Sequence, residues 1–224
     1  MRGFRALAVL ALVALPAAGV SAQATRGFKD SWYWGLKGGA MAYQVQSDNN
    51  AIAPVGGIDW FITRTIGGLY LSLDQTFFHN NTVFLNDSVN PLYTGPRTVY
   101  LSNMRRLTVA GMLFPMQTYR LHPYVGFGGA LNYIASVKPQ GTYVSPGGNT
   151  QKALVDATIE QFRSNTTILA LLGAQFRLPA LSLFGQITAT PATSNFFLFT
   201  GTGVRATAEV GLRYNVGTSV DPMR

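Results

Sequence analysis

The segment GVRATAEVGLRYNV, residues 203–216, alternates without interruption between two kinds of side chain. One set of positions carries Arg205, Glu209 and Arg213 with glycine and threonine between them, and the other set carries valine, alanine, leucine and tyrosine. A period of two residues predicts a β-strand with two unlike faces. The fold therefore depends on which face meets water and which meets an apolar environment.

Seven further segments have the same period and are bounded by Gly, Pro, Asn or Asp. In chain order, we expect strands at 32–45, 53–63, 66–78, 98–114, 123–136, 166–178, 181–190 and 202–216. The joins between them are alternately short and long, as in outer-membrane barrels, which have tight periplasmic turns and long external loops. The pattern predicts an all-β fold, an eight-stranded antiparallel up-and-down transmembrane β-barrel. The long join at 79–97 has the composition of a surface loop.

The longest join contains VSPGGNTQKALVDATIEQF, residues 144–162, and has two interpretations. Lys152, Asp156 and Glu160 are spaced four residues apart, which would suit one face of a short helix. Apolar residues also alternate with polar ones over 155–160, and SPGGN is typical of a turn. We favour a hairpin that extends the fifth and sixth strands beyond the membrane, with a helix as the alternative.

Composition indicates which face of the strands points outward. Only 12% of the 224 residues are charged and 47% are hydrophobic, whereas soluble surfaces carry roughly 25–35% charged residues. Each expected strand has one bulky apolar face, such as Trp32, Trp34 and Leu36 in the first. The lumen of an eight-stranded barrel is too narrow to hold all these faces. We therefore expect the apolar faces to meet lipid and small or polar residues to fill the lumen.

The polar faces carry charges that would then point into the lumen. Buried charge has to be paired, so these residues form a candidate network and the only site that we assign. Its expected members are Lys37, Asp59, Asp74, Arg106, Arg177, Arg205, Glu209 and Arg213. The network could form an ion path or gate, or it could be a structural plug. For eight strands we favour the plug.

The N-terminus has the features of a secretory signal peptide. A cationic start, MRGFR, precedes the apolar run ALAVLALVALPAAGV, and small residues end at Ala22 or Ala24. We expect a signal peptide at 1–22, a periplasmic segment at 23–31, the barrel at 32–216 and a short tail at 217–224. Because the chain has no cysteine, the sequence excludes a lipoprotein anchor and a disulfide framework.

Two stretches, HPYVGFGGAL at 122–131 and ATAEVGLRYNV at 206–216, resemble strands of the small eight-stranded outer-membrane barrels related to the outer-membrane protein A transmembrane domain. The resemblance implies a monomer in the bacterial outer membrane, with membrane lipids and the barrel assembly machinery as partners. It also implies a role in envelope integrity, adhesion or small-solute passage. Such barrels often end in an aromatic residue, whereas Tyr214 is followed by NVGTSVDPMR, so the insertion signal is expected to be internal.

No residue pattern predicts catalysis, a metal site or a cofactor. His79 and His122 are the two histidines; we expect His79 on a solvated loop and His122 in a periplasmic turn, with no assignable nucleophile beside either. Basic residues are scattered along the strands, which argues against nucleic acid as a partner. We predict a non-enzymatic envelope protein whose external loops contact an unidentified surface ligand. The alternative is a narrow channel for small solutes, similar to outer-membrane protein W; a lipid-modifying enzyme is least favoured.

Overall fold

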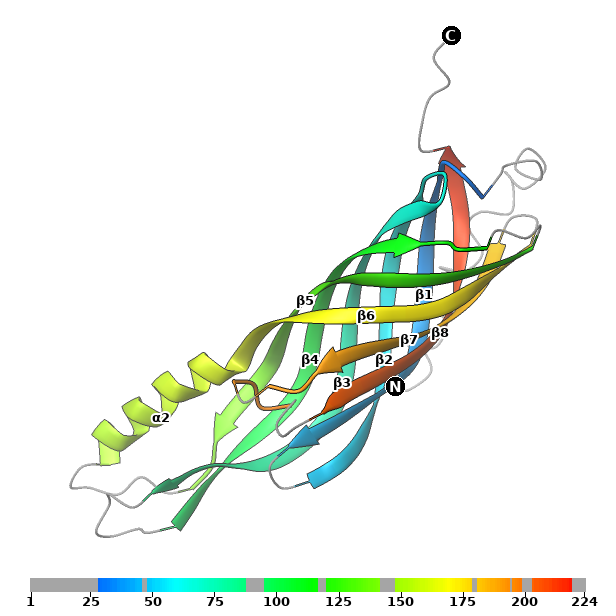
Figure 1. The fold of residues 1–224 in the computed structure, drawn as a ribbon. Helices are drawn as coiled ribbons and strands as arrows, with labels where there is room; N and C mark the ends of the chain where they lie inside the picture. Colours follow the sequence, from blue (N-terminus) through cyan, green and yellow to red (C-terminus); the bar gives the residue numbers. More distant parts are fainter. Residues whose placement is uncertain are drawn as a thin grey trace, which may run out of the picture.

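The computed structural model describes residues 28–45, 48–87, 95–116, 120–141, 148–178, 181–193, 195–198 and 203–218. The expected signal peptide lies outside them, as does the tail from 219 onward. Within the described residues, eight antiparallel strands pair in sequence order, and β1 pairs with β8 to close a barrel (Figure 1). The predicted fold class is confirmed.

The strands are β1 (Ser31–Val45), β2 (Asp48–Thr63), β3 (Gly67–Asp87), β4 (Gly95–Leu113), β5 (Leu121–Pro139), β6 (Ser164–Arg177), β7 (Leu181–Pro191) and β8 (Val204–Thr218). The expectation of a surface loop at 79–97 is wrong, because β3 and β4 continue as a paired hairpin as far as Asp87 and Gly95. Threonine, valine and leucine within 82–85 favour the extended backbone. Strand pairing also gives the backbone N–H and C=O groups hydrogen-bond partners, whatever the side chains are.

The longest join contains the helix α2 (Gly148–Arg163), so the favoured hairpin is wrong and the alternative holds. Ile159 is buried and Phe162 half-buried on one side of the helix, while Lys152, Asp156 and Glu160 are exposed. The four-residue spacing of the charged residues thus marked the solvent face of a helix. None of the helical segments that the structure describes has the length and hydropathy needed to cross a membrane.

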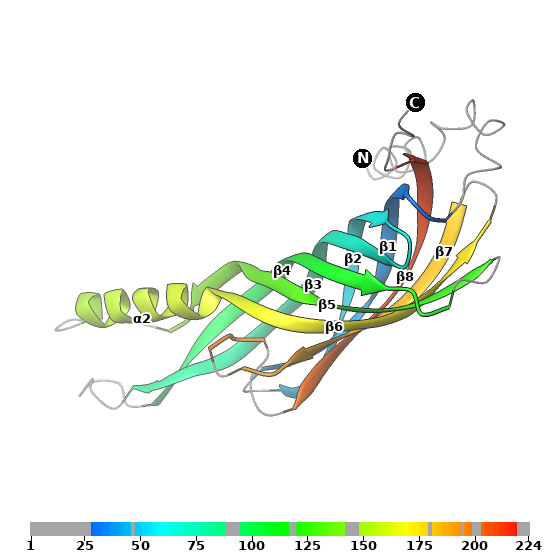
Figure 2. The same cartoon turned by 45° about the horizontal axis from the view of Figure 1, so that its top comes forward.

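The two ends of the barrel differ. The three short joins and the outer ends of β1 and β8, where Ser31 pairs with Thr218, lie at one end, here called the short-join end. From the opposite, long-join end, α2 and the β3–β4 hairpin project on the same side (Figures 1 and 2). The asymmetry expected from the join lengths is therefore present.

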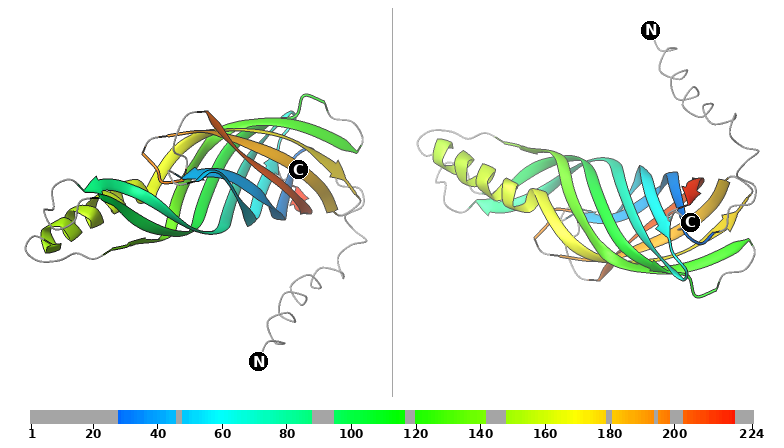
Figure 3. Two further views of the ribbon diagram at one scale, coloured as in Figure 1. Left: turned by 90° about the horizontal axis from the view of Figure 1, so that it is seen from below. Right: turned by 90° about the horizontal axis from the view of Figure 1, so that it is seen from above.

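Paired residues trace one continuous row around the barrel. The row runs through Ala174, Gly185, Val210, Gly38, Gly56, Gln75, Arg105, Tyr133 and Ser164. It starts and ends on β6, and the two β6 residues are ten positions apart. With about 3.3 Å per residue along a strand and about 4.8 Å between strands, this stagger tilts the strands by about 40°. The tilt is visible in Figure 3.

Bulky apolar side chains cover the outside of the barrel. Residues of the expected lipid face are exposed, among them Leu36 (63%), Phe127 (64%) and Val210 (64%), and their neighbours in sequence point inward. We call this outward-facing surface the apolar belt; its exposed members include Trp32, Trp34, Leu36, Ile58, Leu69, Leu73, Leu107, Val109, Leu113, Val125, Phe127, Leu131, Ile168, Leu172, Leu183, Ile187, Val210 and Leu212. The alternation predicted from the sequence is thus followed around the whole barrel.

The lumen is less polar than expected, because an apolar cluster fills each end. The short-end cluster includes Phe28, Phe61 and Phe114, and the long-end cluster includes Met41 and Ile159 with residues of the β7–β8 join. Inward-facing glycines leave room for some of the rings. A Cβ atom on Gly173 would lie 2.6 Å from the Tyr124 ring, and one on Gly211 would lie 2.6 Å from the Phe184 ring.

Candidate functional site

A buried lysine joins three strands in the middle of the lumen. The Lys37 Nζ atom on β1 lies 2.8 Å from Asp74 Oδ1 on β3 and 2.9 Å from Glu209 Oε1 on β8. It also donates a hydrogen bond of 2.9 Å to the Tyr70 hydroxyl. The ammonium protons therefore all have acceptors, and both carboxylates share one cation.

The strand register explains why Lys37 reaches Asp74. Gly57 on β2 is paired with Lys37 on one side and with Asp74 on the other. A Cβ atom at this glycine would lie 2.2 Å from Asp74 Oδ1 and 2.7 Å from the Leu73 carbonyl oxygen, so the carboxylate and the backbone would have to shift. The glycine thus leaves the space in which the two charged groups meet.

A second ion pair repeats this arrangement nearer the short-join end. Arg213 on β8 and Asp59 on β2 flank Gly35 of β1 in the register. Arg213 Nη2 and Nε donate to Asp59 Oδ2 at 2.8 and 3.0 Å, and both side chains are fully buried. A Cβ atom on Gly35 would lie 2.0 Å from Asp59 Oδ1. The guanidinium also lies 3.7 Å from the Phe184 ring centroid, a cation–π contact.

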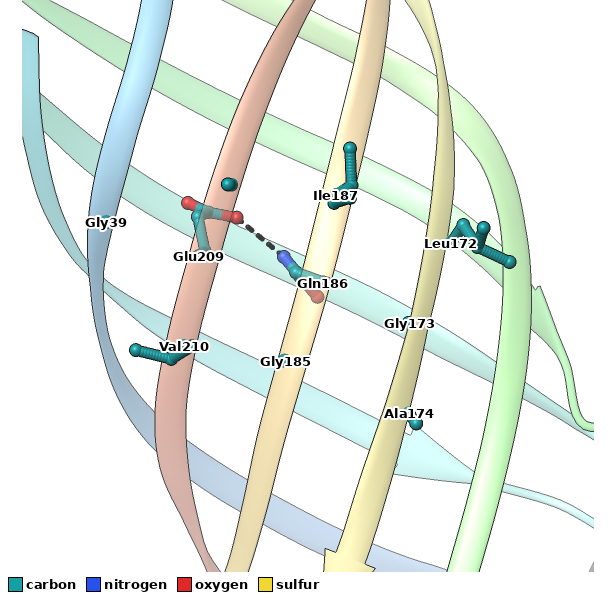
Figure 4. Close-up of a pocket in the computed structure, with 10 residues that line it drawn as sticks. Gly39, Leu172, Gly173, Ala174, Gly185, Gln186, Ile187, Glu209 and Val210 are labelled. Carbon is teal, nitrogen blue, oxygen red and sulfur yellow. Dashed lines mark hydrogen bonds between the residues drawn. The ribbon is translucent and has the colours of Figure 1, made fainter.

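Neutral side chains extend the first ion-pair cluster, and the sequence analysis did not include them in the network. Gln186 Nε2 donates to Glu209 Oε2 at 2.7 Å (Figure 4) and also to the Tyr70 hydroxyl at 3.1 Å. The Tyr124 hydroxyl donates to Gln186 Oε1 at 3.0 Å. Each of these residues occupies an inward position, so the period-two pattern could have identified them as lumenal.

The remaining predicted members are placed differently. Arg106 is buried beside this cluster, where Nε donates to Asn132 Oδ1 at 2.8 Å and Nη1 to the Thr207 hydroxyl at 3.4 Å. Arg205 is half-buried toward the long-join end and donates to the Gln44 side chain. Arg177 is half-buried at the short-join end. The structure therefore brings six of the eight candidate residues into the middle of the lumen and leaves two near its ends.

These six residues, which we call the charged layer, balance in charge: Lys37, Arg106, Arg213, Asp59, Asp74 and Glu209. Each has a relative exposed area of 8% or less, so the layer is dry enough for its electrostatic attractions to be strong. Mutual pairing offsets the desolvation that burial imposes on each group. The arrangement suits a rigid filling of the barrel.

The two histidines lie apart from the charged layer. His79 is exposed on β3. The expectation that His122 lies in a turn is wrong: it is within β5, buried, and its ring stacks on Phe28 with centroids 3.9 Å apart. The described residues contain no group of three or more His, Asp or Glu side chains that could hold a metal ion.

Comparisons with known proteins give a likeness in fold. No protein-family model matches the chain, and no curated protein matches it. Neisserial surface protein A is similar over 82% of this chain and 96% of its own, with 10% identity and a TM-score of 0.49. Ail, the attachment invasion locus protein of Yersinia pestis, is similar over 83% of this chain and 99% of its own, with 11% identity and a TM-score of 0.46. A major outer membrane protein from Thermus thermophilus is similar over 82% of this chain and 98% of its own, with 11% identity and a TM-score of 0.42.

The sequence identities are low, and the likeness extends to the fold alone. The closed barrel itself rests on strand pairing within this chain, including the pairing of β1 with β8. The described part of the chain is thus a closed, eight-stranded antiparallel up-and-down β-barrel.

Proposed function

We propose that this chain is a non-enzymatic barrel of the bacterial outer membrane, with a plugged lumen and a projecting long-join end that makes surface contacts. The observation that carries the proposal is that the apolar belt lies on the outside of the barrel and the charged layer lies inside, the reverse of the distribution in a soluble protein. We further propose that residues 1–22 direct export and that the mature chain is a monomer.

The apolar belt supports a lipid environment on energetic grounds. Exposed apolar surface costs about 25 cal/mol per Å² in water, and contiguous exposed patches beyond a few hundred Å² are rare in soluble monomers. A closed barrel also pairs its backbone N–H and C=O groups within the wall, which hydrocarbon requires. The same surface that would be a liability in water is therefore stable in a bilayer.

The filling of the lumen favours a plug over an ion path. Charged groups of the layer are paired with one another or hydrogen bonded to neutral partners, and an apolar cluster lies on either side of them. At the long-join end, Phe196, Phe197 and Leu198 of the β7–β8 join are buried in the long-end cluster. Leu198 O accepts a hydrogen bond of 3.1 Å from the backbone N–H of Gln44, which holds this join against β1.

The long-join end offers surface for contacts outside the membrane. The β3–β4 hairpin and α2 project from it (Figure 2). The Phe162 ring packs at 5.8 Å from the Phe197 ring, which fixes the base of the helix. Lys152, Asp156 and Glu160 then face solvent, and a polar helix whose base packs on the barrel supports a structural or adhesive role.

Three measurements test this proposal. The refolded barrel should migrate differently on gels before and after heating in mild detergent, because its closed hydrogen bonding resists unfolding. In a planar bilayer it should give no steady single-channel steps. Full solubility of the chain in plain buffer would contradict the membrane assignment, and reproducible conductance would favour the channel instead. N-terminal sequencing of envelope-extracted protein should start at Gln23 or Thr25.

A further inference from the structure

The row of paired residues that circles the barrel has two unlike halves. On β7, β8, β1 and β2 it carries Gly185, Val210, Gly38 and Gly56. A pocket of about 550 Å³ beside Gly185 is lined mainly by residues of β6, β7 and β8 (Figure 4). On β3 to β6 it carries four side chains with hydrogen-bond donors, which we call the polar arc: Gln75, Arg105, Tyr133 and Ser164. These four residues are neighbours on the outside of the wall.

The strand tilt places the polar arc at the edge of the apolar belt. A step from one strand to the next along the row climbs about 3 Å toward the long-join end for a tilt of about 40°. Four such steps separate Val210 from Arg105, a climb of about 12 Å, which is half the height of an apolar band about 25 Å tall. Val210 lies in the middle of β8, so Arg105 lies at the boundary. The next outward residues below the arc, Leu73 and Leu107, are apolar and exposed.

Arg105 is exposed, and no ion pair or hydrogen bond joins its guanidinium to another of the described residues. Nearby Arg163 is the opposite case. Its Nε and Nη2 atoms donate to the carbonyls of Ile134 and Ala135 at 3.0 and 3.1 Å, its Nη1 pairs with Glu160 at 2.8 Å, and it lies 4.7 Å from the Tyr133 ring centroid. Arg163 therefore bonds the base of α2 to β5 and its charge is paired with that of Glu160. The Arg105 charge has no such partner among the described residues.

A guanidinium at the edge of hydrocarbon has a defined chemical complement. Its planar N–H groups match a phosphate in two-point hydrogen bonds, and phosphate groups of membrane lipids lie at this depth. Gln75 Nε2 makes one hydrogen bond, to the Thr76 carbonyl at 3.3 Å, and keeps a second proton. Tyr133, which pairs with Arg105, and Ser164, which pairs with Tyr133 on the next strand, are both exposed.

We propose that the polar arc binds the phosphate group of a membrane lipid whose acyl chains lie against the apolar belt. Arg105 holds the phosphate, and the Gln75 amide and the hydroxyls of Tyr133 and Ser164 supply flanking donors. This inference rests on the proposed membrane location of the barrel. It assigns one side of the barrel, β3 to β6, as a lipid-selective surface.

Native mass spectrometry of the refolded full chain in detergent tests the inference. The barrel is titrated with dimyristoyl phosphatidate and, in parallel, with dimyristoylglycerol, which has the same chains without the phosphate. Arg105→Gln should weaken phosphatidate binding about fivefold, as expected for one basic residue near the headgroup level, and should leave binding of dimyristoylglycerol unchanged. The matched control is Lys138→Gln, because Lys138 is an exposed cation of β5 beyond the arc; it should change neither affinity by more than about twofold.

Three outcomes would overturn the inference in a barrel that still shows heat-modifiable migration. Equal phosphatidate affinity for Arg105→Gln and the unaltered chain would remove the role of Arg105. An equal loss in Lys138→Gln would mean that net charge alone governs binding. Displacement of the lipid by millimolar inorganic phosphate would indicate a site for the free anion. A chain that fails to form the heat-modifiable state would instead contradict the proposed function itself.

Discussion

Replacing Lys37 by methionine should be among the most damaging single changes in the lumen. Methionine fills a similar volume but removes the cation that lies 2.8 Å from Asp74 and 2.9 Å from Glu209. Removing one partner of a buried ion pair costs about 3–5 kcal/mol. Two carboxylates lose their shared cation here, although Ser72 and Gln186 still donate to them. We expect a loss in the free energy of unfolding of about 4 kcal/mol.

Urea unfolding of the barrel in lipid vesicles, followed by tryptophan fluorescence, measures this loss. The matched control is Arg64→Met, which breaks a 3.6 Å pair with Asp30 between side chains that are 65% and 44% exposed; it should cost less than about 1 kcal/mol. Adding Glu209→Gln to Lys37→Met should recover part of the loss, because the two cations that remain, Arg106 and Arg213, are then matched by two anions, Asp59 and Asp74. A loss for Lys37→Met no larger than that of the control would refute a dry, paired charged layer.

Gly35→Ala should lower the free energy of unfolding by about 2–4 kcal/mol, because its Cβ atom would lie 2.0 Å from an Asp59 carboxylate oxygen. Gly38→Ala, whose Cβ atom would approach nothing closer than 3.7 Å, is the control, and equal losses in urea unfolding would contradict the packing argument. Val210→Arg should cost about 2–4 kcal/mol by the same measurement, since Val210 faces lipid near the middle of the apolar belt; a neutral result would place it outside the bilayer. A lipid-soluble thiol reagent should label a cysteine at position 210 strongly and one at position 209 weakly, and mass spectrometry of the labelled, folded chain would expose the reverse order.

The barrel could be predicted from the sequence because strand faces are a local property. Alternation in 203–216 specifies which side chains share a face, and the join lengths indicate an up-and-down order. The inward position of Lys37, Asp74 and Glu209 followed from the same pattern. Their contact did not, because it depends on the strand register, and the ten-residue stagger that sets the register is not encoded in any one segment.

The features that sequence analysis missed depend on contacts between distant segments. The helix α2 is held by Phe162 against Phe197, a contact that no local pattern contains. The apolar filling at both ends of the lumen was missed for a related reason. Phe28 lies just before the first strand, yet it packs among Phe61 and Phe114 and stacks on His122. One signal was available: a glycine directly across from two opposite charges on its neighbouring strands marks where an ion pair can form.

The ion pairs of the charged layer also bear on how the barrel is assembled. Neighbouring hairpins can pair as the chain emerges, but β1 and β8 are its first and last strands, and their seam closes only when the two ends of the sheet meet. Lys37–Glu209 joins β1 directly to β8, and Arg213–Asp59 links β8 to β2 across β1. Both ion pairs therefore hold the β1–β8 seam together. Before closure their charged groups stay hydrated, and on closure these groups lose water and pair with one another. An open sheet cannot form these two ion pairs, so they form only when the cylinder is completed.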